Sequence, residues 1–403
     1  MSTSLWYHAF GVRGSTYTRT TSVEGGVEFH ITKPLEQWRC AACGSPALNS
    51  RGKVERRFRA VPIGRRPVTV VYPIPRVACA ACGLIRQVAL DCAEARRSYT
   101  KAFARYALQL CRLMTTQDVA QHLGVSWDVI KDIHKQALRR RCAQPKFEHR
   151  KRLAIDEIGS GAGHRYLTLV LDLDSGAVVH GGRGQGGAAL INFWKRLRRS
   201  RAKVEAVAMA RSPAYLRAVR THLSEATLVF DRFHVMKLCN ERLTALRRQL
   251  YRQATAEGQK VLKGVRWLLL KNPEHLDGSR HERPRLGAAL QLNEPLATAY
   301  YLKEELRASW EQDDADEAEA FRLEWIARAA ASGVRMVAQF AQTLRPHAWG
   351  LLAYYDYSIS TGALEGTNNK IKAMQRQAFG FRDQEYFTLR ILAAHETKYA
   401  LVG

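Results

Sequence analysis

One five-residue sequence, Cys-Ala-Ala-Cys-Gly, occurs twice near the start of the chain, at positions 40–44 and 79–83. Each Cys-x-x-Cys turn aims two thiolates at one metal ion, and two such turns complete a closed tetrahedral zinc site. The ligands would be Cys40, Cys43, Cys79 and Cys82. Because four protein ligands leave no position for substrate, we expect a structural zinc ion, with residues 68–72 forming a strand between the turns. The alternative, buried free cysteines, does not explain the repeated spacing.

The chain is strongly basic. Its 403 residues include 63 Lys and Arg against 37 Asp and Glu, which gives a formal net charge of +26. Such an excess predicts a polyanionic partner, with nucleic acid ahead of a membrane; a basic surface without such a partner is the alternative. No apolar stretch reaches membrane-span length, and the N-terminus lacks a basic segment followed by an apolar run. We therefore expect a cytoplasmic, nucleoid-associated protein without a membrane partner.

Residues 116–131 have the pattern of a helix-turn-helix, although any two short helices can imitate it. The small Ala120 lets two helices approach, Gly124 allows the turn, and Ser126 can cap the second helix. The residues of this motif expected to contact DNA are Ser126, Trp127 and Lys131. A basic linker follows, and its expected phosphate contacts are Arg139, Arg140, Arg141, Arg150 and Lys151. The motif and the linker together predict binding to double-stranded DNA.

The next part of the chain has the order of elements of an RNase H-like fold, in which an antiparallel hairpin precedes strands that alternate with helices. The turn of the hairpin is expected at Asp174-Ser175-Gly176. The expected strands are 152–158, 166–171, 177–180, 204–209 and 227–230, and the expected helices are 188–201 and 213–223. This order places the ends of several strands at one edge of a sheet, where a catalytic site can form.

The glycine-rich segment 182–187, Gly-Arg-Gly-Gln-Gly-Gly, matches the dinucleotide-binding fingerprint and precedes a helix. That fingerprint needs parallel strands on both sides of the helix, whereas the strand before it belongs to a hairpin. An acidic residue should end the next strand, but Glu205 lies at its start. We expect the glycines to form a flexible turn close to DNA and not a nucleotide site.

Six separate motifs follow one another along the chain. After the cysteine turns and the helix-turn-helix, they are Ile155-Asp156-Glu157, Ser212-Pro213-Ala214-Tyr215, Asp231-Arg232-Phe233-His234, and Glu365-Gly366-Thr367-Asn368-Asn369-Lys370-Ile371-Lys372 with Phe379-Gly380-Phe381. In this order they resemble the ISL3 family of insertion-sequence transposases over nearly the whole chain. The resemblance implies a multidomain α/β protein. A zinc-ribbon-like module and a helix-turn-helix would precede a DDE-type, RNase H-like core, which an all-helical insertion interrupts.

The resemblance also implies three carboxylates around two Mg²⁺ ions, which would clamp the reacting phosphodiester. Asp156 would bridge the ions and Glu365 would hold one of them. The position expected to carry the remaining Asp, just before the Ser-Pro-Ala-Tyr segment, is Ala210. The implied activity is hydrolysis at the terminal inverted repeats of the element, followed by attack of the freed 3′-hydroxyl on target DNA. With a methyl group at position 210, we expect this chain to be inactive in cleavage.

Asp231 and His234 form a D-x-x-H element, which the resemblance makes accessory to the three carboxylates. Asp231 also ends a strand, so a role as the second carboxylate stays open, as do a helix N-cap and a salt bridge to Arg232. We favour position 210 for the missing carboxylate because catalytic groups cluster where strand ends converge.

Two further segments are candidates for DNA contact. Asn369 and Lys372 share a helix face with Glu365, where they would contact a sugar-phosphate and a phosphate; an exposed face of ion pairs is the alternative. Trp267, which lies between Arg266 and Lys271 in the helical insertion, would stack on an unpaired base. A place in a hydrophobic core is the more common role for such a residue.

The expected domains are a zinc-binding domain at 1–97, a helix-turn-helix domain at 98–145, the first part of the core at 146–238, the insertion at 239–355 and the glutamate helix at 356–403. Because the reaction needs paired element ends, we expect at least a homodimer on DNA. The competing class is a regulator or domesticated transposase that binds DNA without cutting it, which Ala210 also fits. A junction or RNA–DNA hybrid nuclease is less favoured, because such enzymes rarely need two extra DNA-binding modules.

Overall fold

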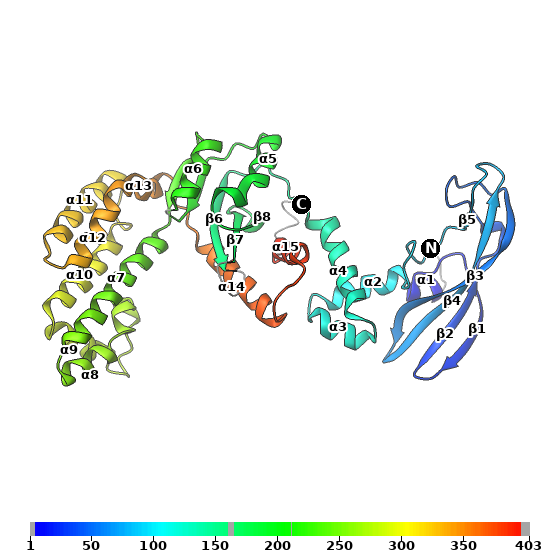
Figure 1. Cartoon of the computed structure of the whole chain (residues 1–403), viewed down its shortest axis with the longest axis horizontal. Coiled ribbons are helices and arrows are strands. Elements are labelled where there is room, and N and C mark those ends of the chain that lie inside the picture. Colours follow the sequence, from blue (N-terminus) through cyan, green and yellow to red (C-terminus); the bar gives the residue numbers. More distant parts are fainter. Residues whose placement is uncertain (1–4, 160–164, 211, 396–403) are drawn as a thin grey trace. The chain divides into compact units, whose positions relative to one another are not determined.

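The computed structural model describes residues 5–159, 165–210 and 212–395, and the chain divides into two compact units, Met1–Arg141 and Cys142–Gly403 (Figure 1). The boundary between the units falls close to the end of the expected helix-turn-helix domain. None of the described helices combines the length and the apolar character that are needed to cross a membrane.

The first unit contains a five-stranded sheet around the long hairpin of β3 and β4. Its strands are β1 (Thr16–Val23), β2 (Gly26–Thr32), β3 (Leu48–Ile63), β4 (Arg66–Cys79) and β5 (Ile85–Gln87). The order is β1-β2-β4-β3, with β5 on the end of β4, and β2 and β4 form the parallel pair. The β-branched Val68 and Val70 of β4 are completely buried and pack in one core with Phe58. The strand expected at 68–72 therefore lies inside β4.

The helices of the first unit are α1 (Leu5–Phe10), α2 (Lys101–Leu110), α3 (Thr116–Leu123) and α4 (Trp127–Cys142). Helix α3 begins in a capping box, because Thr115 accepts from the N–H of Asp118 while the Asp118 carboxylate accepts from the N–H of Thr115. It ends at Gly124, whose φ of 59° is left-handed and permits the turn into α4. Val119 of α3 and Ile130 of α4 are buried in a shared core. The expected helix-turn-helix is confirmed.

Two arginines of the zinc-binding part hold the helix-turn-helix in place. Arg59 of β3 donates a hydrogen bond of 2.5 Å to the carbonyl of Leu123, the last residue of α3. Arg97 forms an ion pair with Asp132 of α4. The sheet and the DNA-binding helices therefore form one unit.

The second unit is built on a mixed five-stranded sheet. Its strands are β6 (Arg152–Gly159), β7 (Tyr166–Asp172), β8 (Ala177–Arg183), β9 (Ala206–Met209) and β10 (Thr227–Phe230). The order is β10-β9-β6-β7-β8, in which β6, β7 and β8 are antiparallel while β9 and β10 run parallel to β6. The connecting helices are α5 (Ile191–Ser200) and α6 (Pro213–His222). This is the expected RNase H-like arrangement, and the antiparallel β8 supports the rejection of a nucleotide site.

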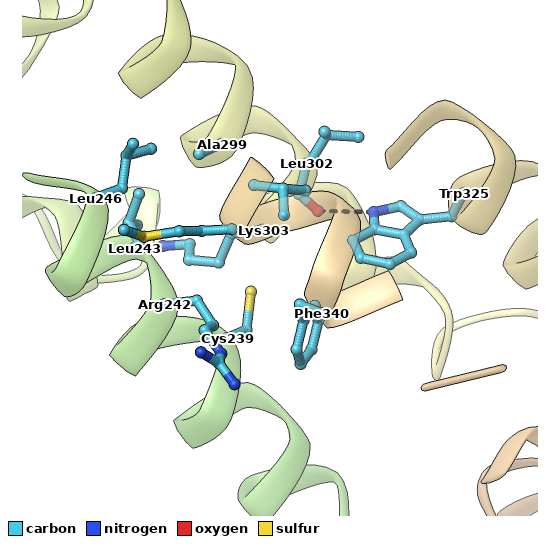
Figure 2. A pocket seen from close by; sticks show the side chains of 11 residues that line it. Cys239, Arg242, Leu243, Leu246, Ala299, Leu302, Lys303, Trp325 and Phe340 are labelled. Atoms are coloured by element: carbon cyan, nitrogen blue, oxygen red, sulfur yellow. Dashed lines mark hydrogen bonds between the residues drawn. The ribbon is translucent and has the colours of Figure 1, made fainter. Parts of the chain in front are cut away.

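An all-helical insertion follows β10, as expected from the sequence. Its α-helices are α7 (Arg232–Gln253), α8 (Ala256–Gly264), α9 (Glu282–Gln291), α10 (Glu294–Ala308), α11 (Ala315–Ala331), α12 (Arg335–Leu344) and α13 (Ala348–Asp356). Trp325 is buried at its centre, and its indole Nε1 donates a 2.8 Å hydrogen bond to the carbonyl of Leu302 (Figure 2). Phe340 packs against the same ring at right angles. The insertion therefore has a hydrophobic core of its own.

Two helices after the insertion return to the sheet. They are α14 (Gly362–Gln377), which contacts β6, and α15 (Gln384–Leu392), which contacts β8. The last segment is thus part of the core, as the sequence predicts. Helix α14 brings Glu365 to the same sheet that carries Asp156.

Candidate active site and zinc centre

The four paired cysteines meet at one point. The Sγ atoms of Cys40 and Cys82 are 3.7 Å apart, those of Cys43 and Cys79 are 3.6 Å apart, and all four lie within 4.8 Å of one another. Tetrahedral zinc with Zn–S bonds of about 2.3 Å needs sulfurs about 3.8 Å apart. The donor set and its geometry therefore fit one structural zinc ion.

Both cysteine turns use the same backbone scaffold. The N–H of Gly44 donates to the carbonyl of Cys40 at 3.0 Å, and the N–H of Gly83 donates to the carbonyl of Cys79 at 2.9 Å. Backbone hydrogen bonds from Cys43 and Ala42 lower the pKa of the Cys40 thiol to about 6. A lower pKa favours the thiolate, which is the form that binds a metal ion.

Position 210 lies between two acidic residues at the point where the parallel ladder of the sheet ends. Met209 of β9 ends the parallel ladder that joins β6, β9 and β10. The next residues along the chain from this last row are Asp156 on β6, Ala210 after β9 and Asp231 after β10. Neighbouring strands are about 4.8 Å apart. A side chain at position 210 therefore stands next in register to both Asp156 and Asp231, at the carboxyl edge of three parallel strands. Ala210 offers no ligand atom there.

Asp156 is mostly buried, with 15% of its side chain exposed, and lies between two other polar groups. Its Oδ2 accepts a 3.0 Å hydrogen bond from Nδ2 of Asn368, and its Oδ1 lies 3.8 Å from Nε2 of His234. Burial raises the pKa of Asp156, and the neighbouring His234 and Asn368 oppose that rise. The structure thus keeps a carboxylate in a position that is costly when no cation is bound.

Asp231 is completely buried and is bound by two residues. Its Oδ2 accepts hydrogen bonds from the hydroxyl of Thr361 at 2.7 Å and from Nδ1 of His234 at 3.0 Å, and its Oδ1 accepts from the N–H of Thr361 at 3.3 Å. Burial disfavours the charge, but the bonds from His234 and Thr361 prevail and lower the pKa of Asp231. The bond to Asp231 also raises the pKa of His234.

The geometry of Asp231 decides among its alternative roles. Asp231 occupies the N-cap position of α7, but its side chain makes no capping bond to that helix, so the capping alternative is wrong. Its ion pair is with His234 and not with Arg232, whose guanidinium lies over the ring of Tyr354. Asp231 therefore connects the start of α7 with the start of α14.

Helix α14 presents different side chains to the sheet and to solvent. Glu365, Asn369 and Lys372 are exposed, whereas Asn368 is buried against Asp156. The sequence interpretation assigned roles to Asn369 and Lys372 and missed Asn368. The spacing of three residues from Glu365 was the available signal, because residues i and i+3 lie on neighbouring positions of one helix face.

Tyr215 is a second residue that the sequence interpretation left without a role. Its buried hydroxyl bonds the hydroxyl of Thr168 at 2.8 Å, accepts from the N–H of Gly186 at 3.1 Å and donates to Oε2 of Glu157 at 3.2 Å. Successive residues of a strand point to opposite faces of a sheet. Glu157 therefore faces away from Asp156, on the side where Tyr215 anchors the glycine-rich segment.

The described carboxylates around Asp156 do not form a cluster of metal ligands by themselves. Asp156 and Glu365 provide the hard oxygen ligands that Mg²⁺ prefers, but Ala210 provides none. Across residues 5–159, 165–210 and 212–395, the cysteine cluster is the one group of three or more His, Cys, Asp or Glu residues whose ligand atoms are placed to hold a metal ion.

The residues predicted to contact DNA in the first unit lie on or beside α4. Ser126 and Trp127 are exposed at its start, and Nζ of Lys131 lies 5.0 Å from the centre of the Trp127 ring. Arg139, Arg140 and Arg141 are exposed at its end, where Arg140 also forms an ion pair of 3.3 Å with Glu94. These placements leave the predicted DNA contacts accessible.

Two predicted contacts in the second unit are engaged in ion pairs. Nη1 of Arg150 lies 3.0 Å from Oδ2 of the fully buried Asp172, which favours a structural role for Arg150 over the expected phosphate contact. Lys151 pairs with Glu205 at 2.8 Å but stays largely exposed.

Trp267 is exposed, unlike the buried Trp325 of the same insertion. Its side chain has a relative exposure of 64%, and the guanidinium of Arg266 lies 4.5 Å from its ring centre. The core alternative for Trp267 is therefore wrong. An exposed indole beside a cation is a suitable surface for an unpaired base.

Three protein-family models match successive parts of the chain. A family described as transposase matches residues 153–391, the helix-turn-helix domain of transposase family ISL3 matches residues 88–137, and the zinc-finger of transposase IS204/IS1001/IS1096/IS1165 matches residues 36–82. The transposase for insertion sequence element IS1001 of Bordetella parapertussis is 33% identical over 359 residues, which are 88% of each chain. The transposase for insertion sequence element IS1557 of Mycobacterium tuberculosis is 28% identical over 86% of this chain and 83% of its own length.

One solved structure, the Drosophila P element transposase strand transfer complex, aligns with 75% of this chain and 94% of that chain. The TM-score is 0.36 and the identity is 10%, which is too low to support an argument about the fold. The family models and the sequence relatives are therefore the evidence for what this chain is similar to.

Proposed function

The chain belongs to the ISL3 family of insertion-sequence transposases, and from this premise we propose that it binds and pairs the ends of its element without cutting them. The observation that carries the proposal is the place of Ala210, next in register to both Asp156 and Asp231. Members of this family act as DNA endonucleases and strand transferases. A methyl group at this strand end removes a ligand that the chemistry needs.

Asp156 and Glu365 are the residues that would hold the catalytic divalent cations, which we infer to be Mg²⁺ from the hard oxygen donors. Such ions stabilise charge on the attacking and leaving oxygens of a phosphodiester. Loss of one protein ligand weakens ion binding and misplaces the reacting groups, which raises the barrier by several kcal/mol, on the order of the effects of misplaced catalytic groups.

Neither neighbouring acid replaces the missing carboxylate. Asp231 is completely buried, and its oxygens already accept hydrogen bonds from His234 and Thr361. Glu157 points to the opposite face of the sheet and bonds Tyr215. We therefore assign Asp231 and His234 a positioning role, in which they fix α14 and its Glu365 against the strand ends.

DNA binding should persist because its principal elements lie in the first unit, away from position 210 in the sequence. The zinc centre supports the sheet that holds the helix-turn-helix through Arg59 and Arg97. In the second unit, Asn369 and Lys372 are proposed to contact the DNA backbone, and Trp267 is proposed to stack on an unpaired base.

The pairing of ends implies at least a dimer on DNA, since two ends must be held together for one reaction. Mass measurement of the complex with end-containing DNA tests this stoichiometry. A strict monomer on paired ends would contradict it.

The decisive experiment restores the missing ligand. Ala210→Asp should give Mg²⁺-dependent cleavage of end-containing DNA, whereas Ala210→Asn, which has the same size without the charge, should stay inactive. Glu365→Gln in the Ala210→Asp background should abolish cleavage again. If the unmodified chain already cuts at a normal rate, the proposal is wrong and Asp231→Asn becomes the next variant to examine.

A further inference from the structure

Phe379 is the most exposed large apolar side chain among the described residues, with a relative exposure of 101%. It follows α14, where the N–H of Gly380 bonds the carbonyl of Gln375 at 2.9 Å and the N–H of Phe379 bonds that of Arg376 at 3.1 Å. These two bonds form a Schellman motif, whose central position requires a left-handed backbone and is usually glycine. Phe379 occupies that position with a φ of 50°.

The side chain gains nothing from this position within the chain. A left-handed φ is unfavourable for a residue with a Cβ, and a fully exposed ring adds no buried apolar area. Backbone strain of this kind concentrates at functional sites. Glycine would serve the turn better, so the ring points to a ligand.

The turn that carries Phe379 is anchored on its other side. Phe381 stacks on Phe387 of α15 with ring centres 4.7 Å apart and an angle of 22° between the planes. Asp383 caps α15 by accepting from the N–H of Tyr386 at 3.0 Å. Phe379 therefore projects from a turn that is fixed at both ends, which lowers the entropy lost on binding.

Cationic residues flank Phe379 in the sequence. Lys372, Arg376 and Arg382 are exposed on α14 and in the turn after it. Within the described ranges, no carboxylate forms an ion pair with any of these three side chains. An exposed aromatic ring next to unpaired cations is the combination that binds single-stranded nucleic acid, because bases stack on the ring while the cations contact phosphates.

We propose that Phe379 is a stacking platform for an unpaired base of DNA that runs along α14. Helix α14 extends 12 residues from Glu365 to Gln377, and at 1.5 Å per residue this is about 18 Å, or roughly five base steps. The contact would therefore lie in the DNA roughly five base steps from the phosphate at Glu365. The inference depends on DNA binding by the chain and not on which residue occupies position 210.

Two DNA probes of one sequence test this site with the full chain. One is a blunt duplex, and the other carries a single-stranded 3′ tail of three nucleotides with 2-aminopurine at its centre. Base stacking tolerates any sequence, so element ends are not required. The parent chain should prefer the tailed probe and quench its fluorescence. Phe379→Ala and Phe379→Gly should reduce the preference for the tailed probe over the blunt probe at least about fivefold, and Phe379→Trp should keep it.

Stability measurements separate this role from a structural one. Phe379→Gly relieves the backbone strain and should melt at the same temperature as the parent or higher, whereas Phe381→Ala should lower the melting temperature. Arg376→Ala should weaken both probes equally, and Leu323→Ala, which changes an exposed apolar residue of α11, should alter nothing. The proposal is overturned if Phe379→Gly binds and quenches the tailed probe like the parent, melts several degrees lower, or changes only self-association.

Discussion

Asn368 donates a hydrogen bond of 3.0 Å to the carboxylate of Asp156, a residue 212 positions earlier in the chain. The bond joins the buried face of α14 to β6, so it fixes the helix that carries Glu365 on the strand that carries Asp156. The bond from Thr361 to Asp231 does the same at the start of α14. Buried polar contacts therefore set the distance between the two carboxylates that remain.

Asp156→Asn should stabilise the metal-free protein at neutral pH. Burial raises the pKa of Asp156, so the native state binds a proton at this carboxyl more tightly than the unfolded state does. The folded protein therefore loses stability as the pH rises above the pKa of the unfolded carboxyl, about 3.9, and the buried group becomes charged. The neutral amide avoids that loss, with a gain on the order of 1 kcal/mol in unfolding free energy. Denaturant unfolding in EDTA at several pH values checks this, and the gain should vanish toward pH 4.

The exposed Glu365 provides the matched control for that variant. Glu365→Gln should leave the unfolding free energy unchanged within about 0.5 kcal/mol. If Asp156→Asn were less stable than the parent at neutral pH, the contacts with Asn368 and His234 would outweigh the cost of burying the charge.

Thr361→Val should destabilise the chain by about 1.5–3 kcal/mol, because a buried carboxylate loses a hydroxyl donor. Hydrogen bonds from His234 and Thr361 lower the pKa of Asp231 against the effect of burial, so its contribution is present above pH 4 and is lost as pH falls through the lowered pKa. The difference between variant and parent should therefore be largest at neutral pH. Thr361→Ser keeps the hydroxyl and should cost less than Thr361→Val; equal losses would contradict the assignment.

Purified protein should contain about one tightly held zinc ion per chain, as one closed site of four thiolates requires. Cys79→Ser should lose the metal and unfold part of the first unit, because zinc binding and folding are coupled in such modules. Metal analysis with thiol titration provides the measurement. Folded, metal-free protein with four reactive thiols would rule out the site.

DNA binding should weaken steeply with salt, because phosphate contacts dominate in so basic a chain. Neutralising Arg139, Arg140 and Arg141 together should weaken all DNA alike and reduce the salt slope by about 2–3. Lys131→Ala should instead reduce the preference for element ends. Titrations of end-containing and unrelated DNA at several salt concentrations compare the two, and unchanged nonspecific binding in the triple variant would remove the arginines from the interface.

Most of the fold could be predicted from local patterns. The cysteine spacing predicted the metal cluster, the Gly124 turn predicted the DNA-binding helices, and the order of strands predicted the sheet, whereas the family resemblance implied its interruption. Each of these features depends on residues close in sequence or on a repeated motif. The assignment of Ala210 to the place of a missing carboxylate came from the family resemblance and stays a prediction.

The partners of the carboxylates could not be predicted. Asn368 and Thr361 contact acids more than a hundred residues away, and the helical spacing of Asn368 from Glu365 does not identify those partners. The ion pair of Arg150 with Asp172, 22 positions later, escaped because Arg150 lies in a basic segment and appeared to be a DNA contact. The fully exposed Phe379 had no assigned role because exposure depends on the packing of the residues around it.

The bond between Asp231 and Thr361 closes a loop of chain that contains the entire helical insertion, since the two residues are 130 positions apart. The insertion leaves the sheet after β10, and the chain returns to the same place at the start of α14. The length of the insertion therefore does not determine where α14 begins. The helical insertion can therefore be lengthened, shortened or replaced in evolution while the geometry of the carboxylates stays the same. The catalytic core and the helices that leave it are free to diverge at different rates.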